Sequence, residues 1–147
     1  MNMKTILNAV MQRLKEQVSE LRYISEDWGQ LDYYETMPPV KFPCALISID
    51  RVNYDVVAKD RKKASVSLVV RIADAPSVTG NVAAPESYRN RAFAIFDLLE
   101  EAGEALNGLS GDTFKRFSLE SIYRENRQDF IREYNMTFET GFTLKEG

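Results

Sequence analysis

Three prolines, Pro38, Pro39 and Pro43, stand directly before an apolar run and constrain the fold more than any other feature of the chain. Proline fixes φ and lacks an amide donor, so the segment that holds them should be extended and should not pair as a central strand. The run that follows, CALI at 44–47, is apolar at every position. Such a run predicts an interior strand that is covered on both faces.

Two segments show the three- and four-residue spacing of apolar positions that is typical of amphipathic helices. The first covers residues 3–21, and the second covers roughly 86–106, with Pro85 suited to its first turn. A loop rich in proline, glycine and small residues, 74–86, leads into the second helix. Each predicted helix therefore has one apolar face that needs a partner in the tertiary structure.

The remaining segments predict strands. The clearest is 64–73, where apolar and mostly polar residues alternate. The order of elements is then α-β-β-β-α-β-β, which predicts a single α+β domain over 1–147. In it, two helices pack on one face of a mainly antiparallel sheet. The other predicted segments are one or two short strands within 22–35, a strand at 44–57, a polar hairpin tip at 58–63, and an antiparallel pair at 116–125 and 129–143.

The composition excludes several kinds of catalysis. The chain has 147 residues, no histidine and one cysteine, so Ser-His-Asp, Cys-His and histidine–zinc chemistry are all excluded. We interpret Cys44 as a small buried hydrophobe, because it begins an apolar strand and has no basic neighbour in sequence. A net charge of −3 disfavours direct nucleic-acid binding. We expect a protein that is not an enzyme and that uses no cofactor or metal.

The N-terminal segment does not have the pattern of a targeting signal. Polar and charged residues interrupt its apolar positions, so it lacks a continuous apolar stretch. Elsewhere no apolar run approaches the roughly 20 residues that span a bilayer. We therefore expect a soluble protein that is made in the cytoplasm and has no membrane partner.

Four carboxylates, Glu26, Asp27, Asp32 and Glu35, cluster in the aromatic segment before the prolines. We interpret them as a solvated acidic strip on the surface. The competing hypothesis is a site for a hard cation in a metal-dependent enzyme, because carboxylate oxygens are the ligands that such cations prefer. Their spacing does not match an EF-hand loop, because the alternating oxygen ligands and the closing glutamate are missing, so the sequence favours the surface strip.

Aromatic residues at 28–34 and basic residues at 58–63 are candidates for contact with another protein. The aromatic side chains either cap the core or form an interface, in which tryptophan and tyrosine are enriched. The basic side chains either protect the edge of a hairpin from aggregation or contact an acidic protein surface. The candidate assembly residues are Trp28, Tyr33, Tyr34, Lys59, Arg61 and Lys62.

The stretch 28–49, WGQLDYYETMPPVKFPCALISI, together with the order of elements, resembles the tail terminator or tail-completion proteins of long-tailed bacteriophages and prophages. In that family a first helix leads to an aromatic-Gly-Gln-Leu-type segment, and a proline then precedes a small apolar strand entry. The residues FPCALI at 42–47 match this entry. The resemblance spans essentially the whole chain.

The resemblance implies a structural virion protein that terminates the tail tube and joins tail to head. Its subunits would form a homo-oligomeric ring, typically a hexamer, and its partners would be the tail tube protein and the head connector protein. Its location would be the host cytoplasm during assembly and then the virion tail. The alternative is a non-catalytic module that binds a small molecule or a peptide, which would need a concave apolar pocket.

Overall fold

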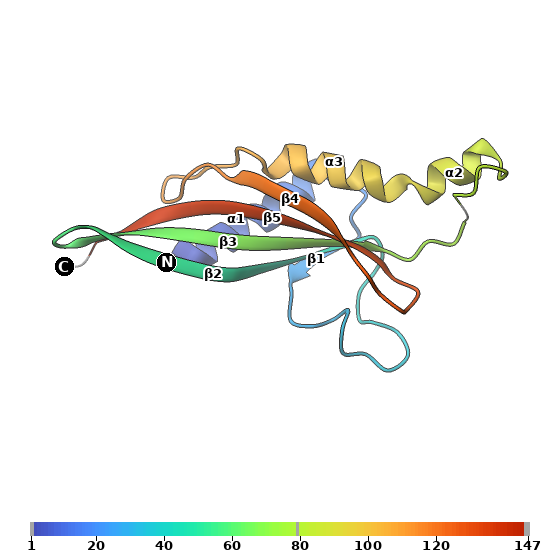
Figure 1. Cartoon of the computed structure of the whole chain (residues 1–147), viewed down its shortest axis with the longest axis horizontal. Coiled ribbons are helices and arrows are strands. Elements are labelled where there is room, and N and C mark those ends of the chain that lie inside the picture. Colours follow the sequence, from blue (N-terminus) through green and yellow to red (C-terminus); the bar gives the residue numbers. More distant parts are fainter. Residues whose placement is uncertain (1, 79, 146–147) are drawn as a thin grey trace.

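Five strands form one twisted sheet, and the two longer helices pack on one of its faces (Figure 1). The computed structural model describes residues 2–78 and 80–145. Strand β1 runs parallel to β2, the other neighbouring pairs are antiparallel, and the strands follow the order β1-β2-β3-β5-β4. The elements are α1 (Asn2–Gln17), β1 (Tyr23–Glu26), β2 (Cys44–Ala58), β3 (Arg61–Asp74), α2 (Glu86–Ala92), α3 (Ala94–Leu106), β4 (Ser118–Glu125) and β5 (Arg132–Lys145).

The main core lies between this face of the sheet and helices α1 and α3. Alternate residues of β3 point into it, as the strand periodicity predicts. The removal of these side chains from water is the main favourable contribution to the free energy that holds the helices on the sheet. The α+β class and the placement of helices on one face are therefore confirmed. The buried side chains include Ile6, Val10 and Leu14 from α1, Ala64, Val66, Leu68, Val70 and Ile72 from β3, and Ile95, Leu99 and Ala102 from α3.

A second, smaller core covers the other face of the sheet at the start of β2. There Cys44 and Leu46 pack with Leu31 and Ile131, while the alternate residues of the same strand belong to the main core. All four residues of the CALI run are fully buried. The prediction of a strand covered on both faces is confirmed, and the cover on this side comes from the chain between β1 and β2 and from the segment before β5.

Both predicted helices differ from the structure. The first ends at Gln17 instead of residue 21, because the chain must turn before it enters β1 at Tyr23, although Leu21 remains in the core. The second is divided at Phe93, whose amide bonds to the carbonyls of Arg89 and Arg91 and whose backbone leaves the helical conformation. Apolar spacing alone does not reveal such a break, since it continues on both sides.

The strand ends also shift. The tip of the β2–β3 hairpin is only the turn at 59–60, and Arg61 already pairs with Ala58. Charged side chains do not prevent strand pairing where both faces meet water. Strand β5 begins at Arg132 instead of residue 129, because the Asp129 side chain accepts the amide of Ile131 and holds a turn there.

The β2–β3 hairpin extends beyond the helices to one end of the molecule, where it is drawn in green in Figure 1. The segment between β1 and β2 loops out below the strands in that view, on the side away from α3. The hairpin therefore has a buried inner end and an exposed outer end, and the burial of β2 falls along its length in the same way.

Candidate functional site

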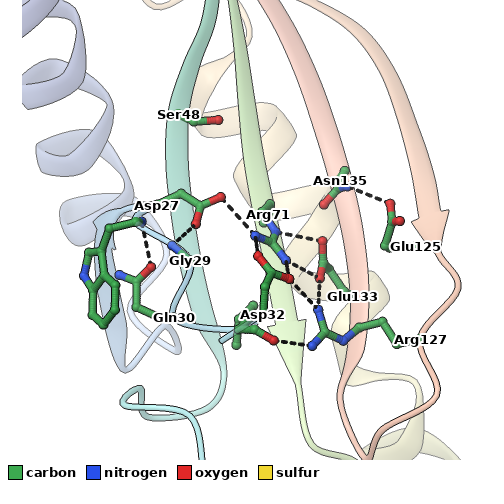
Figure 2. Close-up of polar contacts among 12 residues, drawn as sticks. Asp27, Gly29, Gln30, Asp32, Ser48, Arg71, Glu125, Arg127, Glu133 and Asn135 are labelled. Carbon is green, nitrogen blue, oxygen red and sulfur yellow. Dashed lines mark hydrogen bonds and ion pairs between the residues drawn. The ribbon is translucent and has the colours of Figure 1, made fainter. Parts of the chain in front are cut away.

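The sheet face opposite the helices carries a network of ion pairs centred on Arg71 (Figure 2). Its guanidinium donates two hydrogen bonds to Glu133, at 2.8 and 2.9 Å, and two to Asp32, at 2.9 and 3.0 Å. A further bond of 3.0 Å reaches Asp27. Two-point pairing of this kind fixes both position and orientation. Arg71 thus ties β3 to β5 and to the segment after β1.

Arg127, in the turn between β4 and β5, extends the network. It donates to both carboxylate oxygens of Asp129, at 3.0 and 2.7 Å, and to Glu133 at 2.8 Å. It also donates to the backbone carbonyl of Leu31. The Tyr34 hydroxyl donates to Asp129 at 2.8 Å. Two guanidinium groups therefore hold together pieces of chain that are about a hundred residues apart in the sequence.

The ionisation of these groups follows from their partners. Burial works against the charge on Arg71, but its bonds to Glu133, Asp32 and Asp27 outweigh burial and keep its pKa above the ordinary value. The bond from Arg71 lowers the pKa of Asp32, and the bond from Arg127 lowers that of Asp129. Each of these groups is therefore charged at neutral pH.

The motif WGQL at 28–31 is what docks the segment after β1 onto this face. Asp27 accepts the amide of Gly29 at 3.0 Å, and Gly29 adopts a φ of +101°, where a side chain would be strained. Buried Gln30 accepts the amide of Trp28 at 2.9 Å and donates to the Glu26 carbonyl at 3.0 Å. In this chain the motif forms short-range hydrogen bonds that fix the backbone of this segment and the orientation of the Asp27 side chain.

A hollow of about 320 Å³ opens on the sheet beside the network. It is lined by Asp27, Asp32, Arg71 and Glu133 together with further acidic, polar and aromatic side chains. Its carboxylates outnumber its cationic groups, so the hollow attracts cationic donors. Its other lining residues are Ser48, Asp50, Val69, Tyr123, Glu125 and Asn135.

The prediction of a solvated acidic strip is wrong for two of its four members. Asp27 and Asp32 lie in ion pairs with Arg71, because the fold brings β3 beneath them. Glu26 and Glu35 are exposed. Among the described residues, no group of three or more cysteine or acidic side chains is arranged to hold a metal ion.

The structure separates the three predicted aromatic residues. Trp28 is 62% exposed and Tyr33 is 84% exposed, so both are accessible to a partner. Tyr34 is half-buried, and its ring contacts Phe130 edge-to-face at 6.3 Å. Of the three, Tyr34 belongs to the network described above, whereas Trp28 and Tyr33 project from it.

The predicted basic residues lie at the far end of the hairpin. Lys59 and Arg61 are exposed, and Lys62 is half-buried. Apolar side chains stand beside them, since Val56 is 72% and Val57 is 56% exposed. The tip therefore offers positive charge together with apolar surface, and the structure does not bring it near the aromatic segment of the same chain.

The residues that matter most on the open face are missing from the candidates that the sequence provides. Arg71 and Glu133 occupy the polar positions of alternating strands, where charged residues usually face water. One sequence feature could have identified them: Arg71 lies near the end of β3 and Glu133 near the start of β5, close to buried apolar residues. Asn135 pairs directly with Arg71 in the β3–β5 register, which the sequence does not specify.

Comparison with known proteins extends the description of the fold. In sequence, neither the protein-family models nor the curated proteins yield a match. In structure, the chain is similar to a chain of the solved "Virion of native gene transfer agent (GTA) particle", with a TM-score of 0.52 and 13% identity. The likeness covers 94% of this chain and 94% of that chain. At this identity the likeness is one of fold, over nearly the full length of both chains.

The described helices include none that is both long enough and apolar enough to cross a bilayer.

The single cysteine is unsuited to nucleophilic reaction, because burial raises the pKa of the Cys44 thiol to about 12. Nucleophilic chemistry requires the thiolate, which is scarce at neutral pH for such a group. Cys44 therefore contributes to packing in the second core.

Proposed function

We propose that this protein is a virion structural subunit that ends the tail tube as a ring of copies and joins the tail to the head. The observation that carries the proposal is the shared fold with a virion chain over 94% of both lengths. The sequence resemblance of the stretch 28–49 to tail terminators supports the same class. The proposed role is non-catalytic, and the proposed partners are further copies of the chain, the tail tube protein and the head connector protein.

The surface of the molecule supports assembly. Trp28 and Tyr33 are large, exposed and held on an ordered segment, which lowers the entropic cost of using them in a contact. Tryptophan and tyrosine are the residue types that most often dominate interfaces. We propose that these two side chains contact the tail tube or the head connector.

The test is polymerisation of the tail tube protein in the presence of this protein. We expect tubes of limited length that carry a ring at one end, seen by negative-stain electron microscopy. Replacing both Trp28 and Tyr33 by alanine should weaken capping by about tenfold or more, as the loss of aromatic anchors does. The control is Val82→Ala, which truncates a side chain that is also 85% exposed.

Tubes that grow unchanged, with no bound protein on their ends or on the connector, would overturn the proposal. The alternative of a small-molecule or peptide-binding module stays a prediction. Saturable binding of such a ligand by a protein that ignores the tube would favour it.

A further inference from the structure

Within the acidic hollow, the side-chain oxygen of Asn135 lacks a donor. Asn135 is 7% exposed, and its amide nitrogen donates to Glu125 at 3.2 Å, which fixes the direction of the oxygen (Figure 2). Among the described residues, no donor lies within hydrogen-bond distance of this oxygen. A buried acceptor without a partner is costly, so the site is suited to a group that donates.

Two carboxylates beside it also have capacity for a cation. The described contacts of Asp50 and Glu125 are with neutral groups, the Ser48 hydroxyl at 2.9 Å and the Asn135 amide. By contrast, Asp27, Asp32 and Glu133 already accept from Arg71. The open part of the hollow therefore presents three acceptors, two of them charged, next to the apolar surface of Val69 and Tyr123.

The outer end of the β2–β3 hairpin has the complementary properties. Lys59, Arg61 and Lys63 are exposed there, beside the exposed valines at 56 and 57. The exposed carboxylates at this end are Asp55, which is the strand partner of Lys63, and Asp60, so the cationic side chains outnumber the carboxylates there. The tip thus has donors for the acceptors of the hollow and apolar side chains for its apolar part.

The tip cannot reach the hollow of its own chain. Lys59 follows Asp50 by nine residue steps along the extended hairpin, which corresponds to about 30 Å. Figure 1 shows the tip at the left end of the molecule and the loop after β1 below the strands, well away from that tip. Only another copy can bring these two surfaces together. A contact between two different surfaces repeats from copy to copy, and it forms a closed ring where the rotation between neighbouring copies closes.

We propose that the basic tip of the β2–β3 hairpin of one copy inserts into the acidic hollow at Asp50, Glu125 and Asn135 of the next copy. This inference rests on the ring in the proposed function and identifies the surfaces that build it. A metal ion is a poorer occupant, because the described residues offer no cluster arranged for one.

The test is a charge swap followed by sedimentation and light scattering, with and without tail tubes. Lys59→Glu with Arg61→Glu, and separately Asp50→Lys with Glu125→Lys, should each raise the dissociation constant of the assembly about tenfold or more. Mixing the two variants should restore assembly, because opposite charges again face each other. The controls are Lys15→Glu and Glu104→Lys, which reverse exposed charges on α1 and α3.

A cross-link gives a second measurement that does not depend on charge. Lys59→Cys mixed with Glu125→Cys should form a disulfide between two chains on oxidation, while buried Cys44 stays reduced. Circular dichroism of every variant checks that it folds.

Rings or capped tubes that form equally well with the charge variants, and without the cross-link, would overturn this contact and leave the proposed function standing. Tubes that the unaltered protein never caps would overturn the function itself. Loss of tube or connector binding in Glu125→Lys but not in Lys59→Glu would assign the hollow to a different protein and overturn the self-contact.

Discussion

The inner and outer ends of the β2–β3 hairpin contain the same two strands in very different surroundings. At the inner end, Cys44 to Ile47 are buried on both faces, and Arg71 is held by three carboxylates. At the outer end, every residue of β2 from Asn53 onward is exposed. The two strands stay paired along their whole length, from the buried end to the exposed end. One hairpin therefore packs into both cores at its inner end and leaves its outer end accessible to a partner.

The largest expected difference between the two ends is in thiol labelling. In a Val57→Cys variant, the new thiol at the outer end should react with a thiol reagent at pH 8 at least about a thousandfold faster than Cys44. Reaction of Cys44 requires the core to open, which costs most of the stability of a small domain. Mass spectrometry of the two peptides gives both rates in one sample. Similar rates would mean that the inner end opens readily and that the two ends do not differ as described.

Breaking the ion-pair network should have the next largest effect. Arg71→Met leaves buried Glu133 with the single bond from Arg127 and removes the cationic partner of Asp27, and it should reduce the free energy of unfolding by about 3 kcal/mol. The matched variant at the outer end, Arg61→Met, should change it by less than about 0.5 kcal/mol. Urea unfolding followed by circular dichroism measures both. Adding Glu133→Leu to Arg71→Met should recover part of the loss, and no recovery would show that the penalty does not come from the under-compensated charge of Glu133.

Truncating an apolar side chain compares packing at the two ends. Leu46→Ala removes a fully buried side chain of the second core and should cost about 3 kcal/mol, from lost burial and from the cavity it leaves. Val56→Ala, at the outer end, should cost about 0.5 kcal/mol or less, because Val56 is largely exposed in the folded state. Equal costs for the two variants would contradict the division of the hairpin into a packed end and a free end.

Lowering the pH should reduce the stability contributed by the ion pairs at the inner end, and this is the smallest of the expected effects. Asp32 and Asp129 have pKa values below their usual value of 3.8 in the folded protein. Their stabilisation is therefore complete above that value and is lost as the pH falls below it, through the lower folded pKa. Replacing both by asparagine should flatten the fall of the melting temperature between about pH 5 and pH 2, whereas Asp60→Asn at the tip should not. An unchanged acid limb in the double variant would show that the network does not contribute.

The open face was harder to predict than the core, and Asp27 and Arg71 show why. The alternation around Val70 and Ile72 places them in the core without any knowledge of partners, because periodicity and hydrophobicity fix which face is buried. That Arg71 pairs with Asp27, Asp32 and Glu133 depends on contacts 39 to 62 residues apart in sequence. No local sequence pattern specifies such contacts, so the sequence predicts a solvated strip for the same carboxylates.

The α+β class, the alternating strands, the burial of Cys44 and the basic composition of the hairpin tip can all be predicted from the amino-acid sequence. These properties follow from the local spacing of side chains and from their transfer out of water. Three features become visible only in the folded chain: β1 pairs parallel to β2, Phe93 divides the second helix, and Asn135 faces an acidic hollow. Those outcomes depend on strand register and on side chains that meet from distant segments, and the strand periodicity leaves both open.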